Sequence, residues 1–388
     1  MRTTQNASGA GAVLVVGPNW VGDLVMAQSL FKALKLEAPN RAIDVITPLW
    51  GQALIERMPQ VREAIILDVA HGELGLRRRW ELGQALKKQC YAQAIVLPRS
   101  AKAALVPMIA RIPQRTGYRG EHRYGLLNDI RSLDRDTNYR TVDRFIALAG
   151  PGSENWRELV REFGTGTEKA RDLRPCLDST DDQKEAAIQS LGLDRREPKA
   201  PAAARAEHSS RFGTGTIPSP ILSLCPGAEY GPAKRWPAHH FARLARIYLD
   251  RGWRVWLLGS EKDAPITREI LGQAPEAVDL AGQTSLRQAI DLLAASTAAV
   301  SNDSGLMHIA AATSTPLVAL YGSSDPQYTP PLSDKAEVIY KGLECSPCFE
   351  RSCPLGHLNC LRGITPESVS GTLDRALPEN AEPLEPGA

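Results

Sequence analysis

Short apolar runs rich in β-branched residues alternate with amphipathic stretches along this chain, and this alternation is its strongest structural constraint. The first half predicts strands over 13–16, 42–47, 64–69 and 94–97. Between the first two strands, apolar residues recur at helical spacing over 24–35. A strand–helix alternation of this kind predicts an α/β fold, with a doubly wound domain built around a parallel sheet.

The alternation stops at 197–220, a stretch rich in Ala, Pro, Ser and Gly, and then resumes. The second half predicts strands over 221–225, 255–258, 298–301 and 316–321, and helices over 241–250 and 286–295. We therefore expect a first Rossmann-like domain over 1–196, a linker over 197–220, a second such domain over 221–377 and a disordered tail over 378–388. Two facing sheets would place a ligand cleft between the domains.

Composition excludes several classes of protein. The chain has 388 residues, and its 46 Lys and Arg against 44 Asp and Glu give a net charge of +2, which argues against a nucleic-acid-binding protein. No apolar run approaches the roughly 20 residues of a membrane-spanning helix. The run over 12–16 is also shorter than a signal-peptide core, so we expect a cytoplasmic protein. Seven cysteines, an odd number, argue against a framework made only of disulfides.

Polar loops follow several predicted strands, where parallel sheets bind their ligands. Asp23 either caps the next helix or acts as a general base. The loop over 226–237 ends in a Lys-Arg pair, so Lys234 either binds a phosphate or lies in a solvated loop beside a packed Trp236. Glu261 is a ribose ligand, a helix cap or simply an exposed carboxylate.

The segment over 300–312 is the most informative one, because a strand leads through Asn-Asp-Ser-Gly into a helix. The N–H groups and the dipole of a helix start bind pyrophosphate. Gly305 allows a ligand to approach the backbone closely at this point. His308 lies on the first turn, within reach of a phosphate oxygen, and a structural histidine is the alternative.

Four cysteines, Cys345, Cys348, Cys353 and Cys360, crowd into one short segment that also holds His357. The first pair has the spacing of metal ligands, whereas the later spacings match no common zinc module. The sequence is compatible with two interpretations: a structural metal site, or four reduced thiols in a loop rich in Pro and Gly.

Basic residues are concentrated between 71 and 126, where eleven Lys and Arg stand against three Glu, a local charge of +8. Among them, Arg99, Lys102 and Arg119 follow strand candidates. The excess indicates an acidic acceptor or an anionic membrane surface, and a solvated basic face is the alternative.

Together, Gly22-Asp23, the loop over 226–237, the segment over 302–308 and the cysteine block resemble the ADP-heptose:lipopolysaccharide heptosyltransferases, in the same order along the chain. The resemblance implies the GT-B architecture, with an acceptor domain followed by a nucleotide-sugar domain. It implies inverting transfer of L-glycero-D-manno-heptose to the inner core of lipopolysaccharide, with no cofactor required. The cysteine block and the Pro-Gly-Ala-Glu loop favour the branch that adds the second heptose, on heptosyl-Kdo2-lipid A.

The resemblance also implies residue roles. Asp23 would deprotonate the acceptor hydroxyl and Lys234 would hold the donor phosphates. The rest of the donor site would be Glu261 at the ribose, with Asp303, Ser304, Gly305 and His308. Arg99, Lys102 and Arg119 would bind the anionic acceptor, with peripheral contact at the cytoplasmic face of the inner membrane.

Two other functions are open from the sequence. One is a family member with another acceptor, such as the enzyme that adds the first heptose or a later core heptose. The other is a non-catalytic nucleotide-binding module whose cysteine-rich loop contacts a partner.

Overall fold

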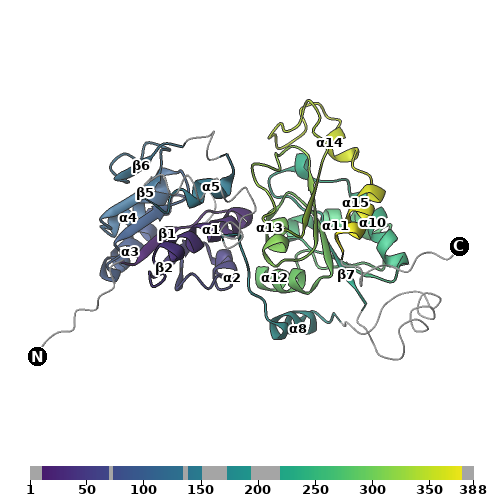
Figure 1. Cartoon of the computed structure of the whole chain (residues 1–388), viewed down its shortest axis with the longest axis horizontal. Coiled ribbons are helices and arrows are strands. Elements are labelled where there is room, and N and C mark those ends of the chain that lie inside the picture. The colour runs from purple at the N-terminus through teal and green to yellow at the C-terminus, as the bar shows by residue number, and fades with distance from the viewer. Residues whose placement is uncertain (1–10, 70–72, 134–138, 151–172, 194–218, 378–388) are drawn as a thin grey trace, which may run out of the picture. The chain divides into compact units, whose positions relative to one another are not determined.

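The computed structural model of the chain describes residues 11–69, 73–133, 139–150, 173–193 and 219–377. The chain divides into two compact units, Met1–Cys176 and Leu177–Ala388 (Figure 1). The sequence predicted a first domain that ends at 196, so the division falls earlier than expected. Most of the predicted linker and all of the predicted tail lie outside the described residues.

Helix α8 (Asp181–Ser190) explains the earlier division, because it belongs to the second unit. It packs against α12 (Leu286–Ala295). Ser179 before it donates to Oδ1 of Asp291 at 2.7 Å, and Gln288 donates to the Ser190 hydroxyl at 3.0 Å. A capping box between Thr180 and Gln183 fixes its first turn.

The first unit is built on a sheet of six parallel strands in the order β3-β2-β1-β4-β5-β6. The strands are β1 (Val13–Val16), β2 (Ile43–Thr47), β3 (Glu63–Ile66), β4 (Gln93–Val96), β5 (Gln114–Tyr118) and β6 (Asp129–Arg131). The helices are α1 (Val21–Glu37), α2 (Gln52–Ile55), α3 (Leu76–Leu86), α4 (Leu105–Ile109) and α5 (Thr141–Ile146), with short η1 (Leu49–Gly51), η2 (Lys87–Gln89) and η3 (Ala101–Ala104).

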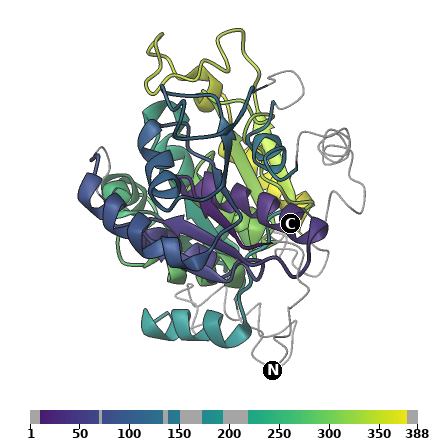
Figure 2. The same ribbon diagram turned by 90° about the vertical axis from the view of Figure 1, so that its left-hand side faces the viewer.

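Helices cover both faces of this sheet. Leu14 and Val16 of β1 share one core cluster with Leu86 of α3 and Val106 of α4. Because side chains alternate along a strand, Val13 and Val15 point to the other face, where α1 packs against α5. Figure 2 looks onto the first unit from the side of its blue α3 and α4 helices.

The second unit repeats this topology, with six parallel strands in the order β12-β11-β10-β7-β8-β9. The strands are β7 (Ile221–Cys225), β8 (Arg254–Leu257), β9 (Val278–Asp279), β10 (Ala298–Asn302), β11 (Leu317–Tyr321) and β12 (Ala336–Tyr340). Besides α8 and α12, the helices are α10 (Ala238–Asp250), α11 (Ala264–Leu271), α13 (Gly305–Ala312), α14 (Asn359–Arg362) and α15 (Pro366–Ala376), with short η4 (Pro232–Lys234) and η5 (Glu261–Asp263).

One face of the second sheet carries a large core cluster that includes Leu224, Phe241, Leu257 and Leu373. Helix α10 packs there against α11 and α15, while α12 packs against α13 and α8. Each sheet is therefore covered on both faces, and its polar groups are concentrated where strands pass into loops. Over the described ranges, no helix is long and apolar enough to cross a membrane.

Candidate active site

Lys234 and Asp303 form a close ion pair at the carboxyl edge of the second sheet. Nζ of Lys234 lies 2.5 Å from Oδ2 of Asp303, and the two side chains are 16% and 5% exposed. Their loops follow β7 and β10, the neighbouring strands at which the strand order reverses. That point in a doubly wound sheet is the usual place for a ligand. Both residues were candidates from the sequence, and the structure brings their side chains together.

Asp303 also accepts a hydrogen bond from the hydroxyl of Ser324, at 2.5 Å from the same Oδ2. Its backbone N–H donates to the carbonyl of Leu320 at 3.1 Å, which fixes the carboxylate at the end of β10. With two donors on one oxygen, the carboxylate holds the Lys234 ammonium in a defined position. The Lys234 ammonium is therefore oriented by Asp303, and the carboxylate balances its charge.

Asn302 joins the loops after β7 and β10. Its side-chain amide donates to the carbonyl of Pro226 at 2.7 Å and accepts from the backbone N–H of Trp236 at 2.9 Å. Trp236 is 1% exposed, and its indole N–H donates to the carbonyl of Ile364 at 2.9 Å. Trp236 packs into the core, as the alternative of a solvated loop had it, and this packing anchors the loop that carries Lys234.

The start of α13 provides backbone donors beside this pair. Ser304 occupies the N-cap position, yet its hydroxyl contacts that of Ser301 at 3.2 Å and does not cap the helix. The first N–H groups of a helix have no partner within the helix. Together with the helix dipole, those of α13 suit an anion such as a diphosphate.

His308 is the fourth residue of α13 and is 5% exposed. Burial lowers its pKa from 6.5 to about 4, an effect that the nearby Asp303 opposes and the Lys234 cation reinforces. The imidazole is therefore neutral at pH 7. His308 is a neutral hydrogen-bonding group beside the Lys234–Asp303 pair.

Glu261 lies at the same edge, because it follows β8, the other neighbour of β7. It is the first residue of η5 and is exposed. The capping alternative for Glu261 is wrong, because Ser260 is the N-cap. Ser260 donates from its backbone N–H and its hydroxyl to Oδ2 of Asp263, at 2.9 and 2.8 Å. The alternative of an exposed carboxylate agrees with the structure, and ribose binding by Glu261 stays a prediction.

Asp23 lies in the first turn of α1, after the central strand β1 of the first unit. The capping alternative is wrong here too, because the helix starts at Val21, three residues earlier than expected, and Trp20 is its N-cap. A carboxylate in the first turn is favoured by the helix dipole. The role of general base stays a prediction.

The three predicted acceptor residues occupy the same carboxyl edge as Asp23. Arg99 and Lys102 follow β4, which neighbours β1, and Arg119 follows β5. Nε of Arg99 donates to the carbonyl of Arg119 at 3.3 Å, so these loops touch. Gly120 permits this approach, because a Cβ there would lie 2.2 Å from the carbonyl oxygen of Arg99.

Arg123 shows that the basic excess is partly structural. It is 2% exposed and donates to the carbonyls of Pro98, at 2.6 Å, and of Tyr118. Burial lowers the pKa of its guanidinium. Arg123 thus holds the loops that present Arg99 and Arg119.

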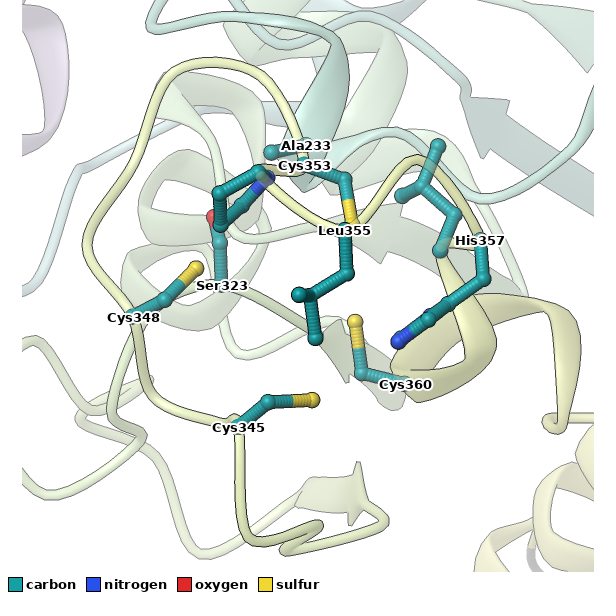
Figure 3. A pocket seen from close by; sticks show the side chains of 10 residues that line it. Ala233, Ser323, Cys345, Cys348, Cys353, Leu355, His357 and Cys360 are labelled. Atoms are coloured by element: carbon teal, nitrogen blue, oxygen red, sulfur yellow. The ribbon is translucent and has the colours of Figure 1, made fainter.

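The cysteine block lines a small pocket in the second unit, with a volume of about 20 Å³ (Figure 3). Its four thiols are free, and the side chain of Leu355 extends among them. Backbone N–H groups, first that of Leu358, lower the pKa of Cys353, whereas burial raises the pKa of Cys360. No three His, Cys, Asp or Glu residues in the described part of the chain are arranged to hold a metal ion.

Two contributors to the site were missed from the sequence. Ser324 follows β11 in a Gly-Ser-Ser turn, and the position directly after a strand, which singled out Glu261, could have found it. Tyr230 donates to the carbonyl of Phe349 at 2.5 Å, and the cations of Lys234 and Arg351 lie 5.0 and 5.2 Å from its ring centre. No local pattern indicates such a contact across more than a hundred residues.

Residues 79–359 match the family described as glycosyltransferase family 9 (heptosyltransferase). Lipopolysaccharide heptosyltransferase 2 of Escherichia coli strain K12 is 42% identical over 371 residues, which cover 94% of this chain and 98% of that protein. Lipooligosaccharide heptosyltransferase 2 of Haemophilus influenzae is 44% identical over 332 residues, 84% of this chain and 88% of that protein.

The fold is also that of a solved relative. The structure of E. coli ADP-heptose lipopolysaccharide heptosyltransferase II matches with a TM-score of 0.77 at 40% identity, over 94% of this chain and 98% of that one. The expected α/β class, with two Rossmann-like doubly wound domains of the GT-B type, is thereby confirmed.

Proposed function

This chain belongs to glycosyltransferase family 9, the heptosyltransferases, and from this we propose that it transfers L-glycero-D-manno-heptose from ADP-heptose to the first heptose of the Kdo-lipid A inner core. The observation that carries the proposal is the identity of 42–44%, over most of the chain, to proteins named heptosyltransferase 2. The alternative of a non-catalytic nucleotide-binding module loses its support with this family assignment.

The donor half of the proposed site consists of Lys234, Asp303 and the start of α13. The remaining N–H groups of the Lys234 ammonium, held by Asp303, would face the diphosphate of ADP-heptose. The N–H groups at Ser304 and Gly305 would bind its oxygens, and neutral His308 would add one further hydrogen bond. Glu261 would accept hydrogen bonds from the ribose hydroxyls.

The reaction is a single displacement with inversion. The acceptor hydroxyl oxygen forms a bond to the anomeric carbon while the bond from that carbon to the ADP oxygen breaks. Asp23 accepts the hydroxyl proton as general base. Negative charge grows on the departing ADP, and Lys234 and the α13 N-terminus stabilise it. We propose that no cofactor is required, because these groups supply positive potential at the leaving group.

The acceptor half consists of Arg99, Lys102 and Arg119. Their cations suit the carboxylates of Kdo and the phosphates of the inner core. They share one sheet edge with Asp23, so one unit offers both the anion-binding groups and the base. Because this acceptor is a lipid, we propose that the enzyme works in peripheral contact with the cytoplasmic face of the inner membrane.

An acceptor panel tests this function. The protein is incubated with ADP-heptose and either Kdo2-lipid A or heptosyl-Kdo2-lipid A, with and without EDTA, and the products are weighed by mass spectrometry. We expect a gain of one heptose on the heptosylated acceptor only, unchanged by EDTA. A gain on Kdo2-lipid A alone would assign the first-heptose reaction, and loss of activity in EDTA would contradict the metal-free step.

A further inference from the structure

Three large apolar side chains stand exposed close together on the first unit. Leu74, Leu76 and Trp80 are 51%, 58% and 57% exposed. Leu76 and Trp80 are four residues apart on α3, so they lie on the same side of the helix. We call these three residues the apolar ridge.

The ridge lies at the margin of the face by which α3 packs onto the sheet. Helix α3 buries Arg79, Gly83 and Leu86, and it covers the face of the sheet opposite α1 (Figure 1). Leu76 and Trp80 lie three residues before Arg79 and Gly83, respectively, so they border this buried stripe, and more than half of each side chain is exposed. Burial of these two side chains needs a surface from outside this unit's own core.

The backbone that carries the ridge is fixed. Nε of the buried Arg79 donates to the carbonyl of Leu74 at 2.8 Å. Gly75 adopts a φ of +54°, and a Cβ there would lie 2.7 Å from the side chain of Val69. The backbone at Leu74 and Gly75 is thus held by contacts with Arg79 and Val69, and it keeps the ridge exposed.

The surroundings of the ridge are basic. Arg77 and Arg78 flank Leu76, and Lys87 and Lys88 follow at the end of α3. The acids nearby are Glu81, paired with Arg77 at 2.8 Å, Asp68, 3.7 Å from Arg78, and Glu73. An amphipathic helix with Trp and Leu among Arg and Lys is typical of a segment that lies in a membrane interface.

Lys102 links the ridge to the acceptor edge. Its Nζ donates to the carbonyl of Glu73, the residue before Leu74, at 3.1 Å. A bilayer that receives the ridge would therefore lie next to Arg99, Lys102 and Arg119, the residues assigned to the lipid-linked acceptor.

We propose that the apolar ridge inserts into the surface of an anionic phospholipid bilayer and places the acceptor edge of the first unit against the membrane. This inference rests on the proposed function, which puts the acceptor in a lipid bilayer. The apolar side chains enter the boundary between headgroups and acyl chains, while Arg78, Lys87 and Lys88 meet the lipid phosphates.

Vesicle sedimentation tests the ridge without any turnover. The full chain is mixed with vesicles of phosphatidylcholine and phosphatidylglycerol in a ratio of about two to one, or of phosphatidylcholine alone. The wild type should bind the anionic vesicles, and the double variant Leu76→Ser, Trp80→Ser should bind roughly tenfold or more weakly. Leu36→Ser is the matched control, because Leu36 is 57% exposed at the end of α1, and its binding should stay at the wild-type level.

Two parallel measurements separate the outcomes. Transfer to detergent-dispersed acceptor should be the same in wild type and double variant. If neither protein transfers heptose, the proposed function is contradicted, and the vesicle-binding result still tests the ridge. Analytical ultracentrifugation without vesicles should give the same mass for both proteins. Equal vesicle binding by the double variant, no binding by the wild type, or a dimer that the double variant dissociates would each overturn the inference.

Discussion

At the residue scale, Asp23 and Lys234 have separable roles, because the base is needed only for transfer and the cation also for donor binding. We predict that Asp23→Asn lowers the transfer rate by roughly a hundredfold or more and leaves ADP affinity unchanged. Rates come from the mass-spectrometric assay and affinities from calorimetry. Transfer near the wild-type rate would remove Asp23 from the role of base.

Lys234→Ala should weaken ADP binding by roughly ten- to a hundredfold, because the variant loses a charge-assisted contact and leaves the buried Asp303 carboxylate unpaired. Lys262→Ala is the matched control. Lys262 lies in the same unit, is 73% exposed and pairs with Glu229 at 2.6 Å, and such exposed pairs contribute little. Equal ADP affinities in wild type and Lys234→Ala would rule out the phosphate contact.

His308 should make the protein less stable in mild acid. Its pKa is about 4 in the folded state and near 6.5 when unfolded, so between these values the unfolded state binds more protons. Stability therefore falls as the pH drops from about 6.5 to about 4, by at most about 3 kcal/mol, and levels off below. Urea unfolding at pH 7 and pH 5 measures this loss, which should shrink in His308→Gln. An equal loss in the variant would assign it to other groups.

The sequence could identify these residues but not their pairing. Lys234 and Asp303 each lie in a loop that follows a strand, and the family resemblance assigned both of them to the donor site. The ion pair between them depends on β7 and β10 being neighbours, which no local pattern states. The start of α1 was placed too late because Gly22 interrupts the apolar pattern before Asp23, and so the capping interpretation of Asp23 was wrong.

At the scale of elements, strands with continuous apolar runs were predictable, whereas others were not. The predicted strand over 221–225 coincides with β7, and the predicted helix over 286–295 with α12. Strand β5 reads Gln-Arg-Thr-Gly-Tyr, and β12 is an edge strand with exposed Glu337 and Val338. Strand β12 needs to bury only part of its surface because it is an edge strand. Strand β5 lies between β4 and β6, yet its Gln, Arg, Thr and Gly residues give it no hydrophobic run.

The turn after β7 depends on a glycine with no room for a side chain. A Cβ on Gly227 would lie 2.4 Å from Cγ of Asp263, whose carboxylate accepts hydrogen bonds from Ser260, the N-cap of η5. We predict that Gly227→Ala lowers the free energy of unfolding by about 1–3 kcal/mol. In α15, a Cβ on Gly371 meets its nearest atom at 3.8 Å, so Gly371→Ala should raise it by about 0.5–1 kcal/mol. Denaturant unfolding measures the change in the free energy of unfolding, which should be negative for Gly227→Ala and positive for Gly371→Ala. If both variants are destabilised, the packing argument is contradicted.

At the scale of the whole molecule, each unit has its own sheet and its own core. The boundary at 176 was not predictable, because α8 joins the second unit through contacts with Asp291 and Gln288 that lie a hundred residues further on. All proposed donor residues belong to this second unit, and both the base and the acceptor residues belong to the first.

This division predicts where ADP stabilises the chain. A ligand that binds only the folded form stabilises it by about 2.7 kcal/mol at a hundred times its Kd, and the gain falls on the unit whose unfolding destroys the site. Hydrogen exchange with saturating ADP should therefore slow the most protected amides of β7 and β10 by roughly a hundredfold, while those of β1 and β4 change little. Mass spectrometry of peptides from the four strands measures the difference, with Lys234→Ala as the control that should lose the effect. Equal slowing in all four strands would show that the units unfold together, and slowing confined to β1 and β4 would move the donor to the first unit.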